Sequence, residues 1–226
     1  MLEQATFALH VVATMLAVVV ARGRPEHRPV AAFLGAGVLA NTLRLLIKIY
    51  VLTPARESMR TMGLDPVAVP FAGWTRAAFH VESALFVGWS AGLAALALWV
   101  LLRRRPWPIA LAWMVVVAAL ALTYPVTRGA VLREWYLGVH LAGLAVATGC
   151  LVMWFARLPR PTLPTMVTGF LIGTELILLA VGPWRGNLFS TWDFAQVAYS
   201  TLYIAISLLQ GGALWFTPTR SPQSRR

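Results

Sequence analysis

Ionisable side chains within long apolar stretches are the residues of this chain that could do chemistry. Such groups are costly inside a membrane, and by default they mark a functional site. At about 1.5 Å per residue along each stretch, we expect them to share a layer roughly 5–15 Å below the outer surface. They are the cations Arg44, Lys48 and Arg76, the acids Glu82, Glu175 and Asp193, the histidines His10, His80 and His140, and the amide Gln196.

The cations of this layer could bind an anion. Asn41, Arg44 and Lys48 are three and four residues apart, so they share one helix face. Guanidinium groups bind carboxylates and phosphates. The alternative is internal pairing with the acids, since the charges of the layer cancel before the histidines are counted. The predicted site for a small ligand, ion or proton comprises Arg44, Lys48, Arg76, His80, Glu82, Glu175, Asp193 and Gln196.

Histidines and carboxylates in the same layer could instead hold a metal ion or haem. Ligation in a helix bundle needs side chains that converge from facing helices. His80, His140 and Glu175 form the best trio, and His10 joins them if the first helix folds close. No H-x-x-x-H or C-x-x-C spacing occurs, so each histidine can equally be a neutral hydrogen-bonded group. The cofactor therefore stays unknown, with a metal or haem as one alternative.

The stretches that carry these residues are transmembrane helices by composition. Of the 226 residues 59% are hydrophobic and 12% are charged, against about 45–50% and about 25% in soluble domains. A span needs about 20 apolar residues. We expect an all-α fold, a single seven-transmembrane-helix bundle over residues 1–226 with a short basic tail at 217–226. The expected spans are 4–21, 30–52, 73–102, 107–123, 135–155, 165–181 and 194–216, and 53–70 is the long connection.

The arginines predict the orientation, because basic residues favour the cytoplasmic side. We therefore expect the N-terminus outside, the C-terminus in the cytoplasm, and a bacterial-type inner membrane. The net charge of +11 indicates attraction to anionic lipids at the cytoplasmic face, not to nucleic acid. Eleven arginines lie on that side, namely Arg22, Arg24, Arg28, Arg103, Arg104, Arg105, Arg157, Arg160, Arg220, Arg225 and Arg226, against five on the other, namely Arg56, Arg60, Arg128, Arg133 and Arg185.

The segment 73–102 has the pattern of a central helix. His80 and Glu82 are two residues apart and point almost opposite ways, which suits a helix with protein on both sides. Its sequence Gly88-Trp89-Ser90-Ala91-Gly92 matches both the hydrolase pattern G-x-S-x-G and the packing pattern G-x-x-x-G. A hydrolase serine needs a strand-to-helix turn, so a helical serine favours packing. Gly143, Ala147 and Cys150 form a similar line of small residues.

Seven spans with an outside N-terminus are typical of the microbial rhodopsins, whose retinal is bound by a lysine of the seventh helix. The one lysine here is Lys48, in the second segment, so a helix-7 retinal Schiff base is excluded. The first hypothesis is a sensor, a transporter or a subunit of a membrane complex with a partner membrane protein. The alternative is a metal- or haem-dependent intramembrane enzyme or redox protein using His80, His140 and Glu175. A third is a scaffold whose buried charges only specify assembly.

Overall fold

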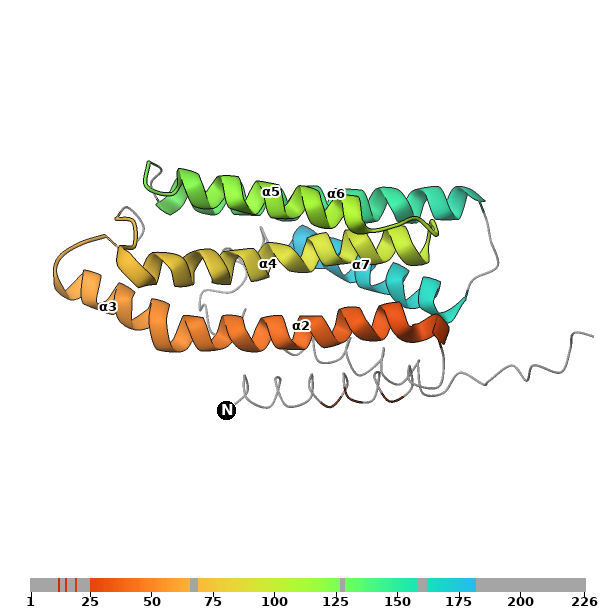
Figure 1. Ribbon diagram of the computed structural model, residues 1–226, viewed down its shortest axis with the longest axis horizontal. Coiled ribbons are helices and arrows are strands. Elements are labelled where there is room, and N and C mark those ends of the chain that lie inside the picture. Colours follow the sequence, from red (N-terminus) through yellow and green to blue (C-terminus); the bar gives the residue numbers. More distant parts are fainter. Residues whose placement is uncertain are drawn as a thin grey trace, which may run out of the picture.

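The computed structural model describes Val12, Met15, Val19 and residues 25–65, 69–126, 129–157 and 162–181, and it contains no strand within them. Most of the helices lie side by side along one long axis (Figure 1). All elements of the described residues are helical, which confirms the expected all-α fold. They are the 3-10 turn η1 (Pro25–His27), α2 (Arg28–Ile47), the π-helical turn η2 (Lys48–Leu52), α3 (Thr53–Thr61), α4 (Gly73–Val100), α5 (Trp107–Thr123), α6 (Gly129–Arg157) and α7 (Leu163–Val181).

Three helical stretches are long and apolar enough to cross a membrane, and this indicates an integral membrane protein. They are Arg28–Thr61, Gly73–Val100 and Glu134–Arg157. Two shorter apolar helices, Trp107–Thr123 and Pro164–Gly173, accompany them. Five of the seven expected spans thus correspond to helices. Segments 4–21 and 194–216 and the tail 217–226 lie outside the described residues, apart from Val12, Met15 and Val19.

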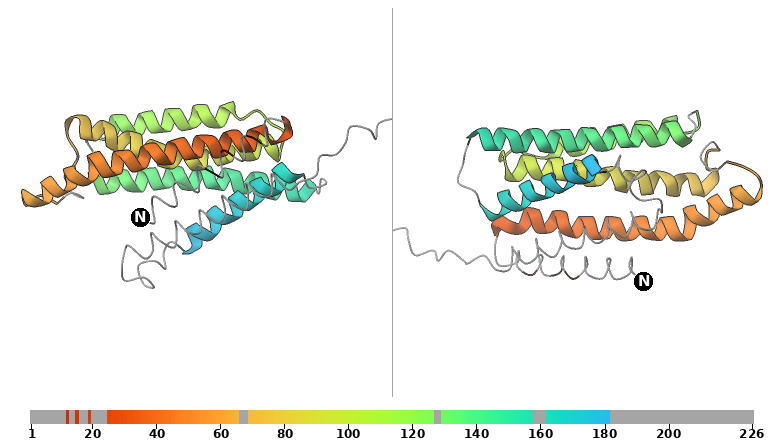
Figure 2. Two further views of the ribbon diagram at one scale, coloured as in Figure 1. Left: turned by 90° about the horizontal axis from the view of Figure 1, so that it is seen from below. Right: turned by 180° about the vertical axis from the view of Figure 1, so that it is seen from behind.

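The central helix is α4, as its sequence predicts. It contacts α2, α5, α6 and α7. Its chain direction is opposite to that of α2, α5 and α7 and the same as that of α6 (Figures 1 and 2). The helix α7 is inclined to the others (Figure 2). Side chains on more than one face of α4 can therefore meet protein partners.

Small residues let α4 and α6 approach closely. A Cβ atom added at Gly143 would lie 2.9 Å from the carbonyl carbon of Ser90. Ala147 and Cys150 of the same line are buried in the apolar cluster that joins α2, α4, α6 and α7. The hydroxyl of Ser90 donates to the carbonyl oxygen of Val87 at 2.9 Å. The structure thus supports packing as the role of this serine and of the small residues facing it.

The expected connection 53–70 is wrong in its first half, because the helix continues through Pro54 to Thr61. A proline inside a helix removes one hydrogen bond and clashes with the carbonyl group four residues earlier. The turn η2 widens the helix just before this point, and the backbone N–H of Thr53 donates to the carbonyl oxygen of Lys48. Pro54 then occupies the first turn of α3, where a proline is tolerated.

Candidate functional site

An ion pair joins α2 to α4 in the apolar part of both helices. The Nη2 and Nε atoms of Arg44 lie 2.9 and 3.1 Å from Oε1 of Glu82. The two side chains are 30% and 19% exposed. Of the alternatives that the sequence leaves open for Arg44, the structure forms the internal pair with Glu82.

An aromatic ring connects this ion pair to a histidine. The guanidinium carbon of Arg44 lies 5.0 Å from the ring centre of Phe86, within the range of a cation–π interaction. The imidazole of His140 stacks on Phe86 with ring centres 4.8 Å apart. The Nδ1 atom of His140 is buried and has no hydrogen-bond partner in the part of the chain that the structure describes. Helices α2, α4 and α6 thus each contribute one member of a stack.

A second histidine lies among tyrosines between α4, α5 and α6. The Nδ1 atom of His80 is 2.8 Å from the hydroxyl oxygen of Tyr136. The ring of Tyr124 lies edge-on to the imidazole at 4.6 Å, and its hydroxyl oxygen accepts a hydrogen bond from the backbone N–H of Phe71. The Nε2 atom of His80 is buried without a partner among the described residues. His80 and Glu82 thus face different helices, as expected.

Phe86 and Tyr136 are site residues that the sequence reasoning missed. A signal exists for both, because Phe86 is four residues after Glu82 and Tyr136 is four residues before His140. Residues four apart share a helix face. A search for aromatic side chains that share a helix face with a charged residue or a histidine would have identified both.

Glu175 is buried and contacts α4 two turns beyond Glu82. Its Oε1 atom accepts a hydrogen bond of 2.6 Å from Nε1 of Trp89. Trp89 is seven residues after Glu82 on α4, which corresponds to about 10 Å along the axis. The helix α7 that carries Glu175 is inclined to the other helices (Figure 2), and its predicted depth in the membrane stays a prediction.

Lys48 and Arg76, which are also predicted ligand residues, take no part in these contacts. Lys48 lies in η2, half-buried, and Arg76 is exposed in the first turn of α4. Neither forms an ion pair with another residue that the structure describes. Asp193, Gln196 and His10 lie outside the described residues.

The predicted metal trio is not assembled. Within the described residues no three His, Cys, Asp or Glu side chains lie close enough to hold a metal ion. The members have separate partners, because His80 bonds to Tyr136, His140 stacks on an aromatic ring and Glu175 bonds to Trp89. The imidazole groups of His80 and His140 therefore lie in separate environments, and each can form hydrogen bonds of its own.

Fold and site together define a helical membrane protein in which charged and histidine side chains of α2, α4 and α6 meet between apolar helices. No protein-family model, curated protein or solved structure matches the chain. Its function is therefore argued from these contacts.

Proposed function

We propose that the chain is a seven-helix protein of a bacterial cytoplasmic membrane with its N-terminus outside. In this proposal the outer half of the bundle holds a polar site for a small ligand, ion or proton. The protein acts as a sensor, a transporter or a subunit of a membrane complex. The helices α2, α4, α5, α6 and α7 support the arrangement, because each runs opposite to the one before it in this series (Figure 1).

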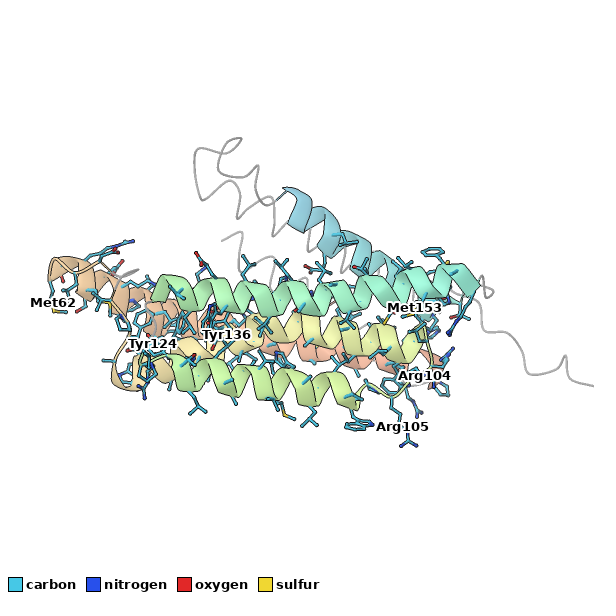
Figure 3. The ribbon with its side chains drawn as sticks, turned by 90° about the horizontal axis from the view of Figure 1, so that it is seen from above. Met62, Arg104, Arg105, Tyr124, Tyr136 and Met153 are labelled. Atoms are coloured by element: carbon cyan, nitrogen blue, oxygen red, sulfur yellow. The ribbon has the colours of Figure 1, made fainter. Side chains whose placement is uncertain are left out.

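The basic end of the bundle supports the orientation and a contact with anionic lipids. Arg103, Arg104 and Arg105 are all exposed after the last turn of α4. Arg104 and Arg105 lie at the opposite end of the bundle from Tyr124 and Met62 (Figure 3). Arg103 has a φ of 55°, a left-handed conformation in which glycine is the usual residue. Three adjacent exposed arginines suit anionic lipid headgroups at the cytoplasmic face.

One observation carries the functional proposal, namely that the Arg44–Glu82 ion pair is connected through Phe86 to His140. Removing two charges from water costs several kcal/mol per ion, and the attraction repays this only with good geometry. Buried polar atoms are normally satisfied, yet Nδ1 of His140 is not satisfied within the described part of the chain. A bound ion or ligand atom would supply the missing interaction.

The proposed mechanism is an exchange of partners. An arriving anion competes with Glu82 for the guanidinium of Arg44, and an arriving cation or proton competes with Arg44 for the carboxylate. A charge gained by His140 would alter the same balance, because its imidazole stacks on the Phe86 ring that Arg44 also contacts. Either event changes the contact between α2 and α4. A sensor or transporter would use this change to move the two helices relative to each other.

The test is a comparison of thermal stability in lipid nanodiscs across a series of probes. The probes are protons, sodium, potassium, chloride, acetate and phosphate, and a bound probe raises the midpoint of unfolding. We expect at least one probe to stabilise the wild type and to lose its effect in Arg44→Gln and Glu82→Gln. The exposed α3 variants Arg60→Gln and Glu57→Gln are matched controls and keep the response. Responses that are absent, or unchanged in the site variants, would show the proposal to be wrong.

Elemental analysis of the same purified protein tests the metal or haem alternative. Iron, zinc or copper near one equivalent, lost in His80→Ala, would replace the proposal by that alternative. We expect no metal above the level of a mock purification, because the His80, His140 and Glu175 side chains have separate partners.

A further inference from the structure

Glu175 is a buried acid for which the described residues supply no cation. Its side chain lies on α7 and is 8% exposed. Its hydrogen-bond partner is the indole N–H of Trp89 on α4. Indole nitrogen is a donor and carries no charge. The carboxyl group of Glu175 therefore has a neutral hydrogen-bond donor as its partner, whereas the carboxylate of Glu82 is paired with a charged guanidinium group.

The described titratable and charged groups on the neighbouring elements do not pair with the carboxyl group of Glu175. The helix α7 packs against η1, α2, α4 and α6. None of the charged or titratable side chains that the structure describes there forms an ion pair or hydrogen bond with Glu175. These groups are His27 of η1, Arg28 and Arg44 of α2, Arg76, His80 and Glu82 of α4, and Glu134, Tyr136, His140, Cys150 and Arg157 of α6.

A carboxylate without a cation is far more costly in an apolar environment than a neutral carboxyl. Ionisable groups of this kind inside membrane helices are typical of proton relays. The Trp89 contact is compatible with both states, because the carbonyl oxygen of a protonated carboxyl still accepts a hydrogen bond. Trp89 therefore fixes the position of the group without deciding its charge.

We propose that Glu175 is a proton-binding group of the bundle. The carboxylate takes a proton from water onto one of its oxygens, forming an O–H bond, and releases it to water again, while Trp89 holds Oε1. This inference deepens the proposed function, on which it rests, since it names the proton as one occupant. It also places that proton beside Trp89, which is seven residues after Glu82 on α4.

A hydrophobic carbodiimide tests the proposal on the full-length protein. The O–H of a protonated carboxyl adds across a C=N bond of the reagent, with oxygen bonding to carbon and the proton moving to nitrogen, and the product rearranges to a stable N-acylurea. Peptide mass spectrometry then locates the adduct. We expect several-fold more adduct at Glu175 than at Glu82, with less adduct as the pH is raised. Absence of an adduct at Glu175, or a yield that does not depend on pH, would overturn the proposal.

Infrared difference spectra between low and high pH give a second measurement that needs no reagent. The C=O stretching band of a protonated carboxyl is expected to appear at low pH in the wild type and to be lost in Glu175→Gln. The amide is nearly isosteric and can still accept the Trp89 hydrogen bond, so this variant is expected to fold. In Trp89→Phe the band is expected to shift in frequency. A band that persists unchanged in Glu175→Gln would assign the proton elsewhere and overturn the proposal.

The two proposals can fail separately. If Glu175 gives no adduct while Arg44→Gln still abolishes a probe response, only the proton site is wrong. If Glu175 titrates while the Arg44 and Glu82 variants keep every probe response, the proposed site between α2 and α4 is wrong. The exposed Glu134 on α6 serves as the control for reagent access from water.

Discussion

The ion pair between Arg44 and Glu82 predicts a strong thermodynamic coupling between α2 and α4. Breaking a fully buried pair by removing one partner costs about 3–5 kcal/mol, because the other charge is left uncompensated. The side chains here are 30% and 19% exposed, so we expect about 2–3 kcal/mol for Arg44→Met or Glu82→Leu alone. Replacing both by apolar residues removes both charges, and the double variant should lie within about 1 kcal/mol of the wild type.

The assay is reversible unfolding in mixed micelles with increasing SDS, followed by far-ultraviolet circular dichroism. Independent residues would give a double variant about 5 kcal/mol less stable than the wild type. The structure instead predicts a coupling energy of about 4–6 kcal/mol, well above the average of about 0.6 kcal/mol for hydrogen bonds between membrane helices. The matched exposed pair Arg60→Met and Glu57→Leu should show almost no coupling. Additive losses at Arg44 and Glu82 would refute the pair.

Three further changes have expected outcomes in the same unfolding assay. Gly143→Ala should lower the free energy of unfolding by about 1–3 kcal/mol, because its Cβ would lie 2.9 Å from the backbone of Ser90. The control Gly149→Ala should be neutral or slightly stabilising, because no heavy atom lies within 4 Å of the added Cβ. Arg103→Gly should gain about 0.5–1 kcal/mol by relieving the φ of 55°; a loss would show that the arginine stabilises the turn. Trp89→Phe should lose about 2 kcal/mol, because the buried carboxyl group of α7 loses its donor; an unchanged midpoint would contradict that hydrogen bond.

The sequence predicts the helices and part of the site because the bilayer leaves few alternatives. A long apolar stretch has to satisfy its backbone as a helix, and the segment 107–123 coincides with α5. The pairing of Arg44 with an acid and the central place of α4 follow from the cost of placing charges in lipid. These features depend on burial cost, which is readable residue by residue.

Other features depend on geometry that a one-dimensional pattern does not contain. Phe86 and Tyr136 are neutral aromatic residues, which are inexpensive anywhere in a membrane, so composition does not distinguish a site residue from a lipid-facing one. The contact of Glu175 with Trp89 depends on how the inclined helix α7 meets α4 (Figure 2). The continuation of the second helix through Pro54 depends on the wide turn η2, whereas proline in a sequence ordinarily marks a helix end.

The response of the purified protein to ions and protons tests the central claim most directly. In nanodiscs, the thermal midpoint of the wild type is compared with those of Arg44→Gln and the control Arg60→Gln across the same probes. We predict that at least one probe raises the midpoint of the wild type and of Arg60→Gln but not that of Arg44→Gln. Equal responses of all three proteins, or no response in any, would contradict a ligand, ion or proton site at the Arg44–Glu82 pair.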